Sequence, residues 1–373
     1  METGLFSYPT PFTPPTTEED ELSSLRLARS RRVGATTFHR LLKDHGSAAA
    51  ALDALPALAR AAGSSDYLPC PMALAQAERD AGRRAGARLL LPGQSDYPAD
   101  LRDFADAPPV LWALGRVELL APPRVAVVGA RNASSLGLRM ARKLAEEMGR
   151  AGFVVVSGLA RGIDAAAHDA ALPTGTIAVM AGGIDVIYPP ENRDLAARIA
   201  TEGLRLSELS PGTEPQARHF PQRNRIIAAL SRATLVVEAA ARSGSLLTAR
   251  MALDYGREVM AVPGHPMDAR AAGCNMLIRD GAVLIRGADD VLEAMGLAPA
   301  ARAAPCPEPS PPPKLPVTGL RAKLLALLGP TPTPEDTVIR DLGIDAATLS
   351  RELIGLEIEG EVTRHPGGLL SRG

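Results

Sequence analysis

The sequence predicts an α/β protein with a doubly wound, mostly parallel sheet at its centre, a small helical domain before it and a winged-helix domain after it. Between residues 124 and 285, short apolar runs alternate with stretches of helical periodicity, which is the pattern of strands joined by covering helices. Most of the runs are almost continuously apolar, as expected for strands that are buried on both faces. A proline-rich segment then separates the end of the chain from this core.

The chain divides by composition into five segments. Residues 1–20 are rich in Pro and Thr and lack the basic and apolar regions of a secretory signal, so we expect a disordered tail. Residues 297–316 are too rich in proline to bury a core, so we expect a linker. Around these we place a helical domain at 21–80, the α/β core at 81–296 and the winged helix at 317–373.

Bulk composition argues against a membrane protein and against a disulfide-stabilised or zinc-stabilised one. No stretch is long and apolar enough to span a bilayer. The three cysteines, Cys70, Cys274 and Cys306, are far apart and show no metal-binding spacing. We therefore expect no disulfide framework, no metal site and a cytoplasmic location.

In the N-terminal domain, Gly34 is predicted to form a turn between two helical segments. Such a unit can bind the DNA backbone through the turn amides and the following helix N-terminus. The alternative is a helical bundle that serves protein interactions. We favour the bundle, because a DNA-binding hairpin of this kind usually has a second glycine in its turn.

The core elements begin with a short apolar strand at 110–114, directly after a pair of prolines. Seven strands and five helices are then expected in alternation. The strands are predicted at 124–130, 153–160, 176–183, 204–209, 234–240, 258–264 and 282–285, and the helices at 136–148, 163–171, within 184–200, 223–231 and 245–256. In the last domain, helices at 320–329, 337–343 and 347–360 precede a hairpin at 361–373.

Charge points to a local anion-binding surface and not to a basic protein. The net charge of the chain is −1, whereas many nucleic-acid-binding domains are strongly basic. From Ser210 to Arg250, however, six arginines stand against only Glu214 and Glu238. Arginine can bind phosphate oxygens with paired donors, so this segment is a candidate phosphate-binding region.

The first three strands end in turns that carry cations. The first turn holds Gly129 and Arg131, and the helix after it should offer free N–H groups to an anion. The glycine spacing there is not that of a dinucleotide fingerprint, so we do not expect an NAD site. Arg161 and Arg193 occupy the second and third turns.

Asp164 and His168 lie four residues apart after the second strand and should share one helix face. One interpretation is a catalytic pair. The other is a helix cap and a packed histidine, which we favour.

Two further turns complete the set. Arg223 and Arg225 flank Asn224 at the N-terminus of a predicted helix, where they could bind phosphate or bracket a base. After the strand at 234–240, Ser243, Gly244 and Ser245 precede a helix that carries Thr248 one turn later. Bare amides and hydroxyls at a helix start favour anion binding.

Because parallel strands end at the same edge of a sheet, these residues should form one cationic rim. Several phosphate contacts in a row suit a nucleic-acid strand better than a mononucleotide. Only 3% of the residues are aromatic, so we expect little base stacking, with bases resting on arginine planes.

The chain resembles the DNA-processing protein A (DprA/Smf) family densely over residues 90–290. The motifs that carry the resemblance are YPADLRDFADAPPVLWALG, VVGARNASSLG, SGLARGIDAAAH, AGGIDVIYPPEN, FPQRNRIIAALS, VVEAAARSGSLLTA and VPGHPMDARAAGCNMLIRDGA. The resemblance implies an extended Rossmann-like core, a sterile-alpha-motif-like N-terminal domain and a homodimer that binds single-stranded DNA. It also implies that the protein protects incoming DNA in natural transformation and loads the RecA recombinase, without being an enzyme and without a cofactor.

Carried over motif by motif, the resemblance implies a set of DNA-contacting residues with no catalytic member. They are Arg131, Arg161, Arg193, Arg223, Asn224, Arg225, Ser243, Gly244, Ser245 and Thr248.

Two other functions are compatible with this kind of core. One is a nucleoside-monophosphate phosphoribohydrolase of the LOG type, whose P-G-G-x-G-T-x-x-E loop carries the glutamate that serves the chemistry. The corresponding segment here, RSGSLLTARMA, has no glutamate, so acid–base help is missing. The other is a nucleotide-sensing module with the winged helix as its reader of double-stranded DNA. The third helix of that domain carries more acids than bases, so a protein-interaction role is at least as well supported.

Overall fold

The computed structural model describes residues 14–64, 66–297, 319–329 and 332–372. Its contacts divide the chain into two units, Met1–Ala298 and Pro299–Gly373. Most of the predicted tail and linker, together with Cys306, lies outside the described residues. Cys70 and Cys274 are buried free thiols.

Four helices form the N-terminal domain: α1 (Glu18–Arg29), α2 (Ala35–His45), α3 (Ala48–Ala61) and α4 (Met72–Arg84). Helix α1 starts inside the segment predicted as tail, because Thr17 and Asp20 form a capping box: the Thr17 side chain accepts from the Asp20 N–H, and the Asp20 carboxylate accepts from the Thr17 N–H. The turn before α2 contains Gly34 as its N-cap, without a side-chain cap. Leu27, Phe38 and neighbouring apolar side chains form the core of this domain.

The N-terminal domain is joined to the sheet through Trp112, which is 1% exposed. Its ring lies so close to α4 that a Cβ at Gly82 would stand 2.1 Å from it. The indole Nε1 donates to Oε1 of Glu78 at 3.1 Å, and Glu78 also receives a two-pronged hydrogen bond from Arg29. The helical domain and the core are therefore packed together as one unit.

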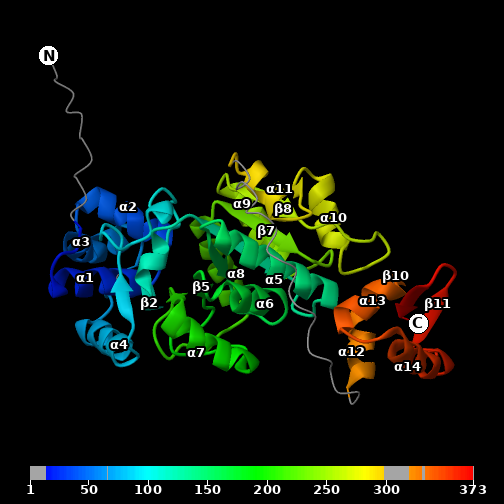
Figure 1. Cartoon of the computed structure of the whole chain (residues 1–373). Helices are drawn as coiled ribbons and strands as arrows, with labels where there is room; N and C mark the ends of the chain where they lie inside the picture. The colour runs from blue at the N-terminus through cyan, green and yellow to red at the C-terminus, as the bar shows by residue number, and fades with distance from the viewer. Residues whose placement is uncertain (1–13, 65, 298–318, 330–331, 373) are drawn as a thin grey trace. The chain divides into compact units, whose positions relative to one another are not determined.

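The core is a nine-stranded sheet in the order β1-β2-β6-β5-β4-β3-β7-β8-β9, covered by helices (Figure 1). The seven strands from β3 to β9 are parallel and confirm the predicted doubly wound sheet. They are β3 (Arg124–Gly129), β4 (Val154–Ser157), β5 (Thr176–Val179), β6 (Leu204–Ser207), β7 (Ala233–Val237), β8 (Glu258–Ala261) and β9 (Val283–Leu284). Two antiparallel strands, β1 (Arg88–Leu90) and β2 (Leu111–Gly115), extend the sheet beside β6.

The covering helices are α5 (Ser135–Arg150), α6 (Ile163–Ala171), α7 (Arg193–Glu202), α8 (His219–Leu230), α9 (Gly244–Asp254), α10 (Ala272–Arg279) and α11 (Ala288–Ala294). Short 3₁₀ helices lie at Ala99–Leu101, Val117–Leu120 and Pro190–Asn192. Alternate residues of β3 pack on opposite layers: Val125 and Val127 pack with α5, α6 and α11, whereas Ala126 and Val128 pack with α8, α9 and α10. Both faces of the strand are thus buried, as its continuous apolar run predicts.

The second unit is a winged helix with its own apolar core, which includes Leu324, Leu349, Leu353 and Leu370. Its elements are α12 (Leu320–Leu327), β10 (Thr333–Pro334), α13 (Glu335–Leu342), α14 (Ala346–Ile358), β11 (Val362–His365) and β12 (Leu369–Arg372). Strand β12 pairs antiparallel with both β11 and β10. Among the described residues of both units, we find no helix with the length and apolarity that a membrane crossing requires.

Candidate nucleic-acid interface

The carboxyl edge of the parallel strands contains the point where the winding of the sheet reverses. From β3 the chain proceeds to β4 on one side, and the neighbouring β7 leads to β8 on the other side. In open α/β sheets, ligands bind at this edge beside such a switch point. The turns after β3, β4, β5, β6 and β7 meet there, and they carry the residues that the sequence predicts as the site.

A pocket opens between the first three of these turns and the start of α8. Three arginines and two aromatic rings take part in its wall. It is lined by Arg131, Gly158, Ala160, Arg161, Ala181, Tyr188, Pro189, Phe220 and Arg223. The predicted residues Arg131, Arg161 and Arg223 are therefore brought together by the fold. Among the residues that the structure describes, no carboxylate lines the pocket.

Arg223 forms the buried side of the pocket and is only 6% exposed. It lies one turn inside α8, whereas the sequence predicts it at the helix start, because α8 begins four residues earlier at His219. Its Nη1 donates to the carbonyl of Val179 at 3.3 Å, while its Nε has no hydrogen-bond partner. A buried cation with an unsatisfied donor is a strong attractor for an anion.

Backbone geometry makes room for this guanidinium. A Cβ at Gly158 would stand 1.3 Å from Nη1 of Arg223, so any larger residue there would displace the guanidinium from this position. Burial lowers the pKa of Arg223 to about 10, and the neighbouring Asp164 opposes the shift. The side chain thus remains a cation at neutral pH.

Asp164 and His168 support the turn after β4 from behind. Asp164 accepts from the N–H groups of Gly158 at 3.0 Å and Ala160 at 3.4 Å. His168 accepts from the Leu159 N–H at 3.3 Å through Nε2, and its Nδ1 lies 2.7 Å from Oγ1 of Thr176. Burial lowers the pKa of His168 to about 3, so the ring is neutral. The contacts of His168 match the interpretation as a packed histidine. The predicted cap is wrong, because Gly162 is the N-cap of α6 without a side-chain hydrogen bond, and Asp164 bonds to the turn before the helix.

Arg131 and an aromatic pair form the open side of the pocket. The Arg131 guanidinium lies 5.1 Å from the centre of the Phe220 ring, and the Phe220 ring lies edge-on to Tyr188 at 5.9 Å. The Tyr188 side chain is 45% exposed. The low aromatic content had led us to expect little stacking, but two of the few rings are placed here. Tyr188 lies in the turn before Arg193, and Phe220 lies in the first turn of α8 before Arg223, so nearby arginines were the available signal for finding them.

Arg161 and Arg193 are exposed beside this pocket. Arg161 makes a long ion pair with Glu191, 3.7 Å between Nη1 and Oε1, with both side chains about 60% exposed. Arg193 is the first residue of α7. The amide of Asn192 donates to the carbonyl of Leu159 at 2.8 Å and holds the two turns together.

The Ser243 turn lies at the end of β7 and does not line the pocket. Helix α9 begins at Gly244, one residue before the predicted start, with Ser243 as its N-cap. The Ser243 and Ser245 hydroxyls lie 2.7 Å apart and hydrogen-bond to each other. Gly244 is exposed, but Thr248 is 2% exposed and its hydroxyl cannot reach a ligand without rearrangement.

Arg225 is turned away from the pocket, contrary to the prediction. Its Nη2 contacts both carboxylate oxygens of Glu208 at 2.5 and 2.6 Å, and its Nη1 donates to the carbonyl of Asp106. Arg29 of the N-terminal domain donates to the backbone oxygen of Glu208 at 3.0 Å. Arg225 therefore joins α8 to the loops beneath the helical domain. Asn224, between the two arginines, is partly buried.

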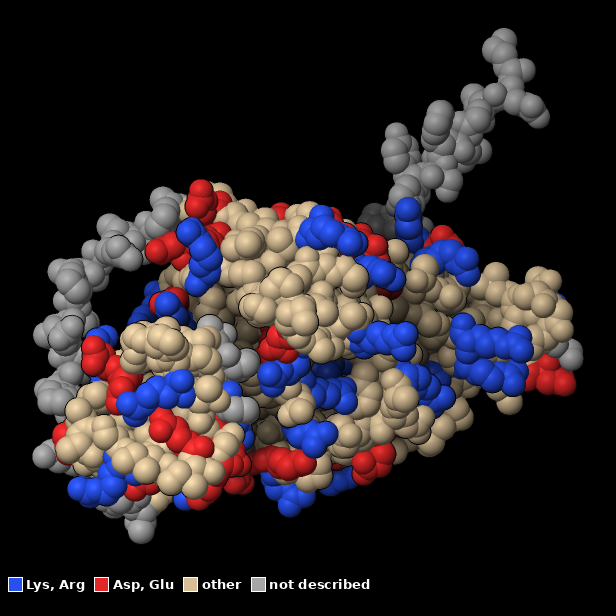
Figure 2. Space-filling model, turned by 90° about the vertical axis from the view of Figure 1, so that its right-hand side faces the viewer, with Lys and Arg blue, Asp and Glu red and all other residues tan. Residues whose placement is uncertain are grey.

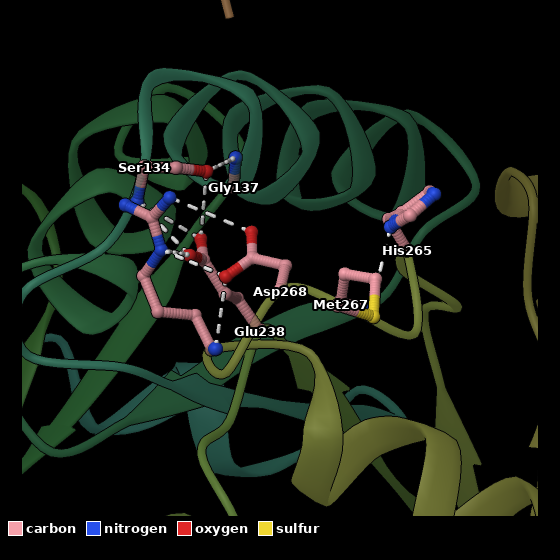
Figure 3. A network of polar contacts seen from close by, with 7 residues as sticks. Ser134, Gly137, Glu238, His265, Met267 and Asp268 are labelled. Carbon is pink, nitrogen blue, oxygen red and sulfur yellow. Dashed lines mark hydrogen bonds and ion pairs between the residues drawn. The ribbon is translucent and has the colours of Figure 1, made fainter. Parts of the chain in front are cut away.

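The sequence predicts free N–H groups at the N-terminus of α5. In the structure this N-terminus is instead occupied by a side chain. The Ser134 N–H donates to both oxygens of Glu238, at 3.0 and 3.2 Å, and Ser134 Oγ donates to Oε2 at 3.0 Å (Figure 3). Glu238 follows β7 and adopts a left-handed φ of 59°. A side chain of the protein thus occupies the anion position of the first strand–helix turn.

Surface charge agrees with a local basic region in a chain of nearly neutral net charge. Figure 2 shows Lys and Arg side chains gathered closely on one face of the molecule, with Asp and Glu side chains at its borders. A basic region of this kind attracts polyanions and gives salt-dependent binding.

Three family models match three successive segments of the chain. Residues 88–296 match DNA recombination-mediator protein A, residues 18–81 match a DprA-like N-terminal HHH domain, and residues 308–368 match a DprA winged helix domain. Protein Smf from Synechocystis sp. is 37% identical over 314 residues, which are 75% of this chain and 79% of that relative. DNA processing protein DprA from Streptococcus pneumoniae is 48% identical over 198 residues, covering 52% and 70% of the two chains.

Two solved structures are also similar. The X-ray structure of DNA processing protein A from Streptococcus pneumoniae has a TM-score of 0.60 at 35% identity, covering 75% of this chain and 98% of that one. The structure of DNA processing protein A from Helicobacter pylori has a TM-score of 0.52 at 31% identity, covering 56% and 95%. The Helicobacter structure is described as showing a single-stranded DNA binding mode.

Proposed function

The chain belongs to the DNA recombination-mediator protein A (DprA/Smf) family, and from that premise we propose that it binds single-stranded DNA along the carboxyl edge of its sheet. In this proposal the protein protects incoming DNA during natural transformation and recombination and loads the RecA recombinase onto it. It acts as a homodimer in the cytoplasm and catalyses no reaction.

The pocket with the buried guanidinium of Arg223 carries the proposal. An unsatisfied Nε in its wall, with Arg131 and Arg161 beside it, suits phosphate oxygens. The exposed ring of Tyr188 and the Arg131–Phe220 pair offer flat surfaces on which unstacked bases can rest. Phosphate contacts and stacking surfaces side by side are what a protein needs to hold a single strand without reading its sequence.

The family supports the finer parts of the proposal. The model that covers the core is described as a recombination mediator, and the Helicobacter relative is described as binding single-stranded DNA. A mediator of recombination must hand its strand to a recombinase, which is the basis for RecA as the partner. A homodimer would let one particle hold two strand segments, with an avidity beyond that of either site.

The absence of an available carboxylate argues against the phosphoribohydrolase alternative. No Asp or Glu lines the pocket, and Asp164 behind it already accepts two backbone N–H groups. General acid–base cleavage of a glycosidic bond requires a group within hydrogen-bond reach of the reacting atoms. The nucleotide-sensing alternative is separated from DNA binding by the experiment below.

The test is a fluorescence-anisotropy titration of a labelled single strand and of a duplex, with AMP binding and cleavage assayed in parallel, at two salt concentrations. The variant is Arg131→Ala/Arg161→Ala. Its control is Arg116→Ala/Arg150→Ala, which removes two exposed arginines at the opposite, amino edge of the sheet. We expect the first variant to bind the single strand about 100-fold more weakly and the salt slope to fall by about 1–2, with the control unchanged.

Two results would contradict the proposal. If AMP bound or were cleaved while the single strand did not bind, the site would belong to a nucleotide enzyme or sensor. If both double variants lost affinity equally, binding would follow overall charge and not the pocket.

A further inference from the structure

We propose that Glu238 is a specificity-determining residue that closes the phosphate position at the switch point of the sheet and so keeps free nucleotides out of the core. The position is the start of α5, directly after β3 and beside β7. In this class of sheet, that turn is where the phosphates of a nucleotide bind, because a helix N-terminus presents free N–H groups and a positive dipole end.

Glu238 occupies this position as an anion would. Its two carboxylate oxygens take the N–H and the hydroxyl of Ser134 at 3.0–3.2 Å. Only 10% of its side chain is exposed. The contact is so close that a Cβ at Gly137 would stand 1.8 Å from Oε2. A phosphate at this turn would compete for the same donors and the same space.

A cation from a third segment completes the arrangement. Nε of Arg270, in the loop after β8, lies 3.3 Å from Oε1 of Glu238 and 3.2 Å from Asp268. Figure 3 shows Glu238 pointing toward Ser134 at the start of the helix, with Asp268 beside it. Without the Glu238 carboxylate, the Ser134 donors and Arg270 would face an empty position with the composition of an anion site.

The backbone holds the carboxylate in place. Glu238 has a φ of 59°, a conformation that a residue with a side chain adopts only when its surroundings impose it. The Ala130 N–H donates to the carbonyl of Glu238 at 2.7 Å and ties the end of β7 to the turn after β3. The side chain is thereby directed at α5 and not at solvent.

The inference deepens the proposed function, since it gives a reason why this core would take a polynucleotide and not a nucleotide. A strand held at the pocket of Arg131 and Arg223 uses many weak phosphate contacts and does not need the α5 position. A free nucleotide depends on one strong phosphate site, and the negative charge of Glu238 repels it there.

The test is isothermal titration calorimetry with ADP on the full chain. Wild type is compared with three variants. Glu238→Ala opens the phosphate position at the start of α5, and Glu238→Gln keeps the shape of the side chain but removes its charge. The third variant is Glu258→Ala. The last is a control for loss of one exposed carboxylate at the amino edge. We expect ADP to bind Glu238→Ala on the order of 100-fold more tightly than wild type, Glu238→Gln in between, and the control as wild type.

Circular dichroism establishes whether each variant is folded. If Glu238→Ala does not fold, the ADP affinity of Glu238→Gln tests the proposal in its place. Folded variants that bind ADP no better than wild type would overturn the proposal. Single-strand affinity is measured on the same samples and is expected to stay within about threefold of wild type, because the pocket is a separate site. If wild type fails to bind the strand, the proposed function falls, while the ADP comparison still decides the role of Glu238.

Discussion

At the scale of single residues, the pocket depends on ionisable groups that are held in unusual states. Arg223 stays charged although it is buried, with Asp164 as its nearby counter-charge. His168, on the same helix as Asp164, stays neutral, because burial penalises the imidazolium. These groups shape the turn that faces the ligand, but only Arg223 itself lines the pocket.

The buried His168 makes the stability of the protein depend on pH. Its pKa is about 3 in the folded protein, against an ordinary value of 6.5 for histidine. The unfolded chain therefore binds more protons between these values, and stability falls as pH falls below 6.5. At 1.36 kcal/mol per pH unit, the loss from pH 7.5 to 5 is about 2 kcal/mol. His168→Gln should be less stable at pH 7.5, but its stability should vary less with pH by about that amount.

Urea unfolding at pH 5, 6 and 7.5 measures this dependence. His265→Gln is the matched control, since it removes one exposed histidine by the same substitution. If the unfolding free energies of wild type and His168→Gln changed equally with pH, His168 would not have the lowered pKa, and the prediction would be wrong.

The sequence identified Arg131, Arg161 and Arg223 correctly as neighbours, because residues that follow parallel strands must meet at one edge. It could not identify the Ser134–Glu238 contact. The two residues are 104 positions apart, and Glu238 reads in the sequence as one more acid after a strand. Nor could it assign a stacking role to Tyr188 and Phe220, whose contact joins the loop after β5 to the first turn of α8.

At the scale of elements, α8 explains why two arginines of one motif have different roles. Arg223 and Arg225 are two positions apart, which on a helix turns their side chains about 200° from each other. Predicting the helix start at 223, four residues too late, placed both at the helix N-terminus, where they could act together. In the helix, one faces the pocket and the other faces Glu208.

Replacing Arg225 should therefore damage stability and not DNA binding. Arg225→Ala leaves Glu208 with its carboxylate 18% exposed and without its ion-pair partner, which should cost about 3 kcal/mol of unfolding free energy. Affinity for a single strand at a temperature where the variant is folded should stay within about threefold of wild type. Urea unfolding and fluorescence anisotropy on the same sample check both parts.

Arg225→Met/Glu208→Gln is the rescue variant, since it removes both charges and should recover most of the lost stability. A folded Arg225→Ala variant of normal stability that no longer binds the strand would instead restore Arg225 to the DNA-binding residues.

The regular elements of the core were the part most readily predicted. All seven parallel strands lie where continuous apolar runs indicated them, because burial on both faces leaves a strong pattern even in four residues. Strand β1 was missed, since three residues carry no periodicity and its pairing with β2 is set by tertiary contacts. The start of α1 was misplaced because Thr17 and Asp20 cap a helix within a segment that otherwise reads as a tail.

At the scale of the whole molecule, the two units have separate apolar cores, and every pocket residue belongs to the first unit. A chain ending at residue 297 should therefore keep the affinity of the full chain for a single strand to within about threefold, and the same salt slope. Anisotropy titrations of the two chains side by side test this. A loss much larger than that would assign the winged helix, directly or through assembly, to single-strand binding.

The single tryptophan of the chain has a practical consequence for such experiments. Trp112 lies at the junction of α4 and β2, 1% exposed and bonded to Glu78, so its emission wavelength reports when water enters that junction. The winged helix contains no tryptophan, so its unfolding does not change the tryptophan emission directly. Comparing the emission shift with far-ultraviolet ellipticity during one denaturant series would therefore resolve the melting of the two units without any label.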